Sequence, residues 1–237
     1  MPSGPGVRRL HQPGGFSPND AGLMEPGGPR MDDAAATLAL RPICDAVHAE
    51  GALICAQLLH AGRYAKVENC VAPSAIRAPI NRHTPRELSE EEIWRTIADF
   101  ATAAANAQAA GFDGVEVMGS EGYLLNEFAV LWTNHRGDDW GGSAENRHRL
   151  PVEVVSAVRE RCGPGFLIIY RISAADLVEG GAPAEEIAAL ARKVEAAGAD
   201  MINTGIGWHR SRVILPATTV VTAEYTIDSI LSVAKPL

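Results

Sequence analysis

The chain has 237 residues, with 21 lysines and arginines against 29 aspartates and glutamates, a formal net charge of −8. This charge argues against a nucleic-acid partner, because a nucleic-acid-binding protein needs a basic face to neutralise phosphates. Hydrophobic residues make up 46% and charged residues 21% of the chain, which is typical of a globular protein with a sizeable core and excludes global disorder.

Targeting and metal-binding signals are not found in the sequence. No apolar run approaches the roughly 20 residues that cross a bilayer, and the opening residues lack the apolar stretch of a signal peptide. We therefore expect a cytoplasmic protein with no membrane partner and with reduced thiols. The cysteines form no C-x-x-C pair, and the histidines show no metal-ligand spacing with a carboxylate, so no metal site is expected.

The first part of the chain predicts one helix and one or two strands. The opening segment is too rich in glycine and proline for a convincing first strand, although a short strand over residues 7–12 is a candidate. A helical pattern follows from Ala34 to Glu50, and Pro42 should bend or shorten that helix. The apolar run from Ala52 to Leu59 then predicts a strand.

A capping box marks the start of the most regular helix. In Ser89-Glu90-Glu91-Glu92 the serine hydroxyl and the last carboxylate satisfy each other's free backbone N–H groups. Apolar residues then recur at helical spacing until Gly111, which can adopt the left-handed conformation that ends a helix. The run from Phe112 to Met118 predicts the next strand.

Two further helix–strand units follow. A helix around 152–161 precedes the apolar strand 166–170, and a helix over 183–197 precedes the strand 199–204. Repeated units of this kind predict an α/β fold with a parallel sheet, either closed as a barrel or open and doubly wound. No strand leads into G-x-G-x-x-G, and long polar loops follow the strands at one end, so we favour a (β/α)8 TIM barrel. Four confident strands fall short of eight, so the barrel is expected to be incomplete.

Two polar residues interrupt the predicted apolar strands. Gln57 must find a partner for its amide, which is either backbone in the core or the imide edge of a ligand, since one amide both donates and accepts. Arg171 ends another strand, and its guanidinium needs an anion. A structural salt bridge to a barrel carboxylate and an electron-rich cofactor are equal alternatives.

Loops after two strands carry candidate acid–base groups. Glu121 and Tyr123 follow one strand, but a loop tyrosine is more often a packing residue than a proton donor, because its unperturbed pKa is about 10. His209 follows the last predicted strand and can act as acid, base or hydrogen-bond donor. The neighbouring Arg210 and Arg212 suit an anionic substrate, with a solvated surface as the alternative.

Several motifs occur in a fixed order along the chain, namely Gln57–Tyr64, Pro73–Ala75, Gly111–Glu116, Gly119–Leu124, Thr133–Arg136 and Trp140–Arg147. Their order resembles that in the old yellow enzyme family, over about Gly14 to Arg212. Three segments are similar to the bacterial 2,4-dienoyl-CoA reductases of that family, namely Met118–Glu121, Ile169–Arg171 and Asn203–His209. The resemblance implies an FMN-binding TIM barrel that passes hydride from the flavin to a conjugated enoyl thioester or related enone, with NADPH as the electron source.

The resemblance also implies roles for individual residues. Gln57 would bind the flavin pyrimidine, Arg171 would bind the N1/O2 edge where charge collects on reduction, and Gly15 would lie near the flavin. Tyr123 would protonate the substrate carbon, with Glu121 and His209 around it.

The acyl-CoA substrate would be contacted by His209, Arg210, Ser211 and Arg212.

The chain also departs from the family pattern. We expect residues 1–237 to form a partial FMN-binding domain without the family's first strand and last two strands, which include the FMN phosphate site. The cysteine cluster for a 4Fe-4S centre and the FAD and NADPH domain of the family have no counterpart in the sequence. Trp132 stands where the dienoyl-CoA reductases tend to carry arginine, which puts that substrate contact in doubt.

Two other hypotheses compete with that of an ene-reductase. One is a truncated fragment that retains no FMN and catalyses nothing. The other is a phosphate-binding barrel enzyme of a different reaction type. An open barrel would also expose strand edges, through which the chain could self-associate.

Overall fold

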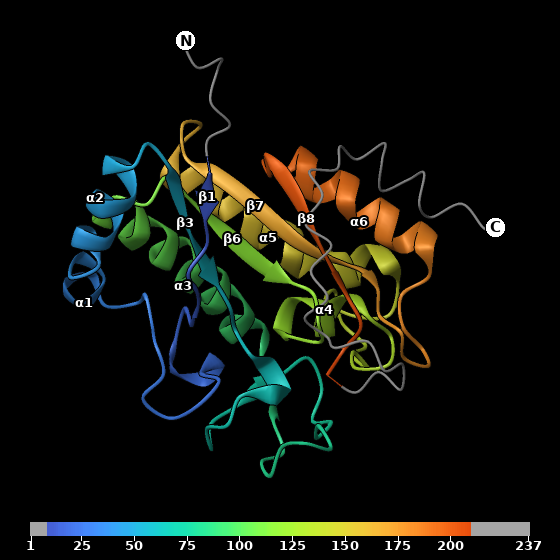
Figure 1. Ribbon diagram of the computed structural model, residues 1–237. Helices are drawn as coiled ribbons and strands as arrows, with labels where there is room; N and C mark the ends of the chain where they lie inside the picture. The colour runs from blue at the N-terminus through green and yellow to red at the C-terminus, as the bar shows by residue number, and fades with distance from the viewer. Residues whose placement is uncertain (1–8, 210–237) are drawn as a thin grey trace.

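The computed structural model describes residues 9–209, which form a curved parallel sheet with helices packed along it (Figure 1). The strand order is β1-β3-β6-β7-β8, with β2 also paired to β3, and every pairing is parallel. The strands are β1 Leu10–His11, β2 Gly14–Phe16, β3 Leu53–Leu58, β6 Gly114–Gly119, β7 Leu167–Ala175 and β8 Met201–Ile206. This arrangement is a half-barrel, and it confirms the predicted α/β fold class.

The opening segment contains more strand than its composition predicts. The strand expected over residues 7–12 lies at β1, and β2 continues along the same edge of β3, with Gly14 opposite Gln57. The glycine-rich composition argued against a convincing strand in this segment and so did not predict the strand at residues 14–16. A Cβ at Gly14 would lie 2.3 Å from the Gln57 Cβ, so the close approach of the two strands requires glycine.

The longest helix begins and ends where the sequence predicts. In α3, Glu90–Ala110, the Ser89 hydroxyl accepts a hydrogen bond from the Glu92 N–H, and the Glu92 carboxylate accepts one from the Ser89 N–H. Gly111 ends the helix with a φ of 98°. The capping box therefore sets the helix register that buries its apolar face against the sheet.

The other helices differ from expectation in their bounds. The helix expected over 34–50 is split into α1 Ala34–Leu38 and α2 Arg41–Ala49, with Pro42 in the first turn of α2. Helix α5, Ala144–Cys162, begins earlier than expected because the Ser143 hydroxyl caps the Asn146 N–H. Helix α6, Ala184–Ala196, starts after Pro183 as predicted.

The remaining elements are short. Helix α4, Leu124–Ala129, follows β6, and a small parallel pair joins β4 Val71–Ala72 to β5 Arg86–Glu87. Single turns of 3₁₀-helix lie at η1 Asp20–Gly22 and η2 Gly62–Tyr64. Among the helices of residues 9–209, none combines the length and apolar character that a membrane crossing needs.

The two faces of the sheet differ in chemistry. Alternate strand residues such as Val115, Val117, Ile168 and Tyr170 join the apolar core formed with the helices. Since side chains alternate across a strand, the intervening positions face the concave side, which is the interior of the half-barrel. Gln57, Glu116, Arg171 and Asn203 lie there, one on each of four neighbouring strands. The alternation therefore separates an apolar layer from a polar interior.

Candidate active site

A chain of polar side chains crosses the interior of the half-barrel. The Gln57 amide donates to one oxygen of Glu116 at 2.8 Å, and the Asn203 amide donates to the other at 2.6 Å. Glu116 is fully buried. Neither alternative weighed for Gln57 named a carboxylate partner. Sequence reasoning missed Glu116 and Asn203 as site residues, although a carboxylate inside an apolar strand is the same signal that singled out Gln57.

Arg171 and Glu121 form a buried ion pair. The Arg171 Nη2 lies 2.6 Å from the Glu121 Oε1, and the two side chains are only 9% and 8% exposed. Of the alternatives for Arg171, the structure thus shows a carboxylate partner. The guanidinium is still not saturated, because its buried Nε has no hydrogen-bond partner among the described residues.

Tyr123 and His209 meet at the carboxyl ends of β6 and β8. The Tyr123 hydroxyl lies 2.8 Å from the His209 Nε2, and the Tyr64 ring packs edge-on against both rings. Burial, the Glu121 carboxylate and the Tyr64 hydroxyl raise the pKa of Tyr123, while Arg171 lowers it. Burial also lowers the pKa of His209, against the opposing effect of Glu121. At neutral pH the pair is therefore a protonated phenol beside a neutral imidazole.

Of the remaining predicted site residues, the structure describes Gly15. Gly15 lies in β2 against β3, where a Cβ would stand 2.7 Å from the Leu59 Cβ. Arg210, Ser211 and Arg212 lie outside the described residues.

The interior residues have the donors and acceptors that a flavin needs. The buried Arg171 Nε has no hydrogen-bond partner among residues 9–209, and Gln57 has a carbonyl oxygen that can accept while its NH2 group donates to Glu116. Amide and guanidinium groups suit the imide edge and the N1/O2 edge of an isoalloxazine, respectively. The residues present therefore fit FMN.

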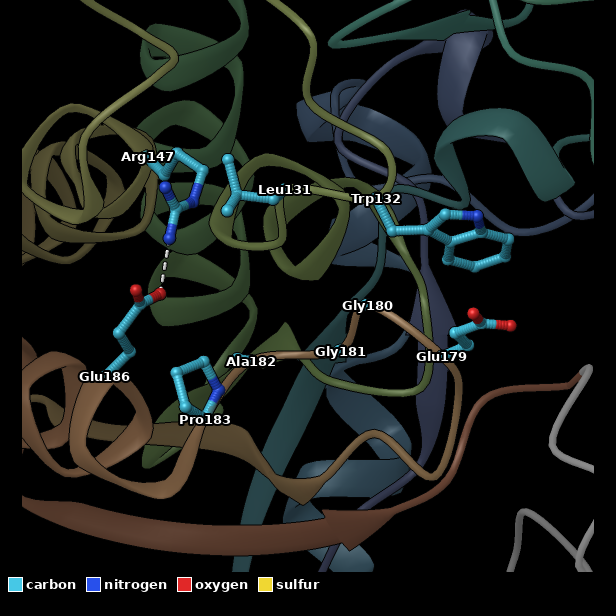
Figure 2. A pocket seen from close by; sticks show the side chains of 9 residues that line it. All are labelled: Leu131, Trp132, Arg147, Glu179, Gly180, Gly181, Ala182, Pro183 and Glu186. Atoms are coloured by element: carbon cyan, nitrogen blue, oxygen red, sulfur yellow. Dashed lines mark hydrogen bonds and ion pairs between the residues drawn. The ribbon is translucent and has the colours of Figure 1, made fainter.

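A separate pocket of about 430 Å³ lies between two loops at the same end of the sheet (Figure 2). Leu131 and Trp132 line one side and residues 179–183 line the other, while an ion pair between Arg147 and Glu186 lies at its end. The pocket contains none of the predicted cofactor or acid–base residues. The Trp132 ring packs against the Trp208 ring at 5.3 Å between centroids.

Two buried histidines predict how stability changes with pH. Burial lowers the pKa of His60 to about 3 and that of His148 to about 4. A histidine whose folded pKa is depressed stabilises the fold above its unfolded pKa, about 6.5, and this contribution is lost as pH falls. The free energy of unfolding should therefore fall below pH 6.5, by up to about 1.4 kcal/mol per pH unit for each histidine.

Urea denaturation between pH 7.5 and 5 measures this effect. Replacing His60 with asparagine keeps an acceptor for the Gly62 N–H, which the His60 Nδ1 accepts at 3.1 Å, and should reduce the acid slope. The exposed His135→Gln is the control and should leave the slope unchanged. An equal slope in both variants would contradict the prediction.

Comparison with known proteins identifies the family. Residues 13–227 match the NADH:flavin oxidoreductase / NADH oxidase family. A metal reductase of Desulforamulus reducens is 42% identical over 191 residues, which cover 79% of this chain and 29% of that protein. An NADPH dehydrogenase of Halalkalibacterium halodurans is 38% identical over 216 residues, covering 90% of this chain and 59% of that protein.

Solved structures agree. A 2-naphthoyl-CoA reductase in complex with 2-naphthoyl-CoA has a TM-score of 0.79 at 33% identity, covering 83% of this chain and 33% of that one. An old yellow enzyme homologue from Zymomonas mobilis has a TM-score of 0.78 at 30% identity, covering 96% and 67%. The chain thus spans less than two thirds of the length of these curated relatives, 29% and 59% for the two above. These findings confirm the resemblance to the old yellow enzymes, and the chain belongs to the NADH:flavin oxidoreductase / NADH oxidase family.

Proposed function

We propose that this chain supplies the FMN-binding and proton-donating residues of an NADPH-dependent ene-reductase. The observation that carries the proposal is the hydrogen-bonded pair of Tyr123 and His209, 2.8 Å apart, with the buried Arg171–Glu121 ion pair near enough to affect both pKa values through Glu121. The guanidinium proposed to bind the flavin and the acid–base pair thus lie toward the carboxyl ends of neighbouring parallel strands. Barrel enzymes carry out their chemistry at this end.

The cofactor would be held by residues of the half-barrel interior. Gln57 would bind the pyrimidine ring, with its amide oriented by Glu116, and Arg171 would bind the N1/O2 edge through its free Nε. Gly15 would keep the neighbouring surface flat. When bound, FMN supplies hydride to the conjugated double bond. The Arg171 guanidinium would place its positive charge at the N1/O2 edge, where negative charge collects on reduction.

The proton would come from Tyr123. Its raised pKa keeps the phenol protonated at neutral pH, so Tyr123 is suited to donate to a strongly basic substrate carbon and not to act as a general base. His209 is neutral under the same conditions, and its Nε2 in the N–H tautomer can donate to the phenolate oxygen as the proton leaves. Glu121, held by Arg171, sets the local charge around the phenol.

The proposed substrate is a conjugated enoyl thioester of the 2,4-dienoyl-CoA kind, or a related enone. Two observations support this class: one structural neighbour is a 2-naphthoyl-CoA reductase in complex with 2-naphthoyl-CoA, an acyl-CoA thioester, and others are morphinone reductases. NADPH is the proposed electron donor, because several relatives are NADPH dehydrogenases. His209 to Arg212 would contact the acyl-CoA, and His209 is the one of these whose position the structure describes.

The test is reconstitution of the purified chain with FMN. We expect the flavin absorption bands to shift when FMN is titrated with the protein, and NADPH oxidation that depends on added 2,4-dienoyl-CoA or 2-cyclohexenone. Gln57→Leu should weaken FMN binding. A folded chain that leaves the FMN spectrum unchanged would overturn the proposal in favour of a non-catalytic fragment.

A further inference from the structure

One buried carboxylate joins the segments that follow three neighbouring strands. Asp176 comes directly after β7 and is 3% exposed. Its Oδ1 accepts from the Trp208 Nε1 at 2.7 Å and from the Asn126 Nδ2 at 3.3 Å, and its Oδ2 accepts from the Ala182 N–H at 2.7 Å. Among residues 9–209 its partners are thus N–H groups, with no cation paired to it.

These bonds lead to both members of the acid–base pair. Trp208 is fully buried and directly precedes His209, and the Gly207 N–H donates to the Ala175 carbonyl beside Asp176. On the other side, the Asn126 carbonyl accepts from the Gly122 N–H at 2.9 Å, and Gly122 directly precedes Tyr123.

The two branches also touch each other. Gly122 has a φ of 83°, and a Cβ there would lie 2.5 Å from the Trp208 ring. The Trp208 indole is therefore wedged between the Tyr123 loop and Asp176, and its rotation would move both. Packing on one face of the indole and a hydrogen bond from its edge to a charged carboxylate together hold the Trp208 side chain in a single orientation.

We propose that Asp176 is a positioning residue that sets the hydrogen bond between Tyr123 and His209, acting through Trp208 on one side and Asn126 on the other. Only the kinetic consequence of this proposal rests on the proposed ene-reductase function. Asp176 touches neither the phenol nor the imidazole, and it belongs to none of the sequence motifs that resemble the family.

The variant Asp176→Asn tests the proposal with minimal change in volume. An asparagine can accept from Trp208, but its amide group then faces the Ala182 N–H, so one acceptor is lost. The matched control is Glu179→Gln, the same change of charge on an exposed side chain of the same loop. Trp208→Phe is a second variant, which removes the indole donor and keeps an aromatic ring.

The first readout is the NMR titration of His209 in the full chain, which needs neither flavin nor turnover. With Asp176 present, Tyr123→Phe should shift the His209 pKa, because it removes the contact at 2.8 Å. With Asp176→Asn or Trp208→Phe, adding Tyr123→Phe should produce no shift, while with Glu179→Gln the shift should persist. An equal shift in all backgrounds would overturn the proposal. If Asp176→Asn unfolds the chain, the Trp208→Phe result decides.

The second readout is the rate of substrate protonation in FMN-loaded protein. Asp176→Asn should slow this step roughly 10- to 100-fold, the effect of a misplacement of about 1 Å, and should have no further effect in the Tyr123→Phe background. If the parent protein does not reduce an enone, the proposed function is rejected, and the NMR result alone decides the positioning role of Asp176. Additive losses from the two substitutions would overturn the proposal.

Discussion

Tyr123→Phe is expected to slow substrate protonation by ~10²-fold to 10⁴-fold, the usual contribution of a positioned general acid. The variant keeps the buried ring and its packing against Tyr64 and removes only the hydroxyl that contacts His209. FMN content and the rate of flavin reduction by NADPH should therefore stay close to those of the parent. Single-turnover oxidation of prereduced protein by a 2,4-dienoyl-CoA isolates the affected step.

Tyr170→Phe provides the matched control. Tyr170 is also fully buried, and its hydroxyl has no partner among the described residues, but it lies on the helix side of β7 in the apolar core. Removing that hydroxyl should leave the single-turnover rate unchanged. Equal rates for Tyr123→Phe and the parent would show that the proton comes from another group, and His209 would be tested next.

Arg171→Met is expected to lower the free energy of unfolding by about 3–5 kcal/mol, even without flavin. The reason is that the substitution leaves the Glu121 carboxylate buried without its cation, since the Glu121 side chain is 8% exposed. Urea denaturation of the flavin-free chain measures this loss. Adding Glu121→Gln to Arg171→Met should recover most of the stability, because a neutral amide is much less costly to bury than an unpaired charge.

Arg95→Met is the control for the loss of an arginine from an ion pair. Arg95 pairs with Glu91 one turn away on α3, and their side chains are 64% and 83% exposed. Solvent screens such a pair, so its loss should change stability by less than about 1 kcal/mol. Similar losses for Arg171→Met and Arg95→Met, or no recovery with Glu121→Gln, would contradict the prediction.

Local patterns in the sequence determined most of the secondary structure. The capping box at Ser89 and the glycine at Gly111 are contacts within a few residues, so the ends of α3 follow from the sequence alone. The apolar runs likewise predicted β3, β6, β7 and β8, because most side chains of these strands are buried. The motif order then indicated the family that the comparisons confirm.

Pairing between distant segments was decided only by the tertiary structure. Residues 14–16 form β2 because β3 lies beside them, and glycine there reflects the closeness of Gln57 and not a turn. The hydrogen-bond partners of Glu116 follow from the strand register, which places it between Gln57 and Asn203.

Asp176 shows the same limit for the candidate site. Its partners Trp208 and Asn126 lie 32 and 50 positions away along the chain, and only the parallel packing of β6, β7 and β8 brings these three residues together. The sequence by itself determined which residues can donate a proton or carry charge, since that is a property of each side chain. Which of them meet at hydrogen-bond distance depends on strand register and loop packing, because these long-range contacts are not encoded in any local pattern.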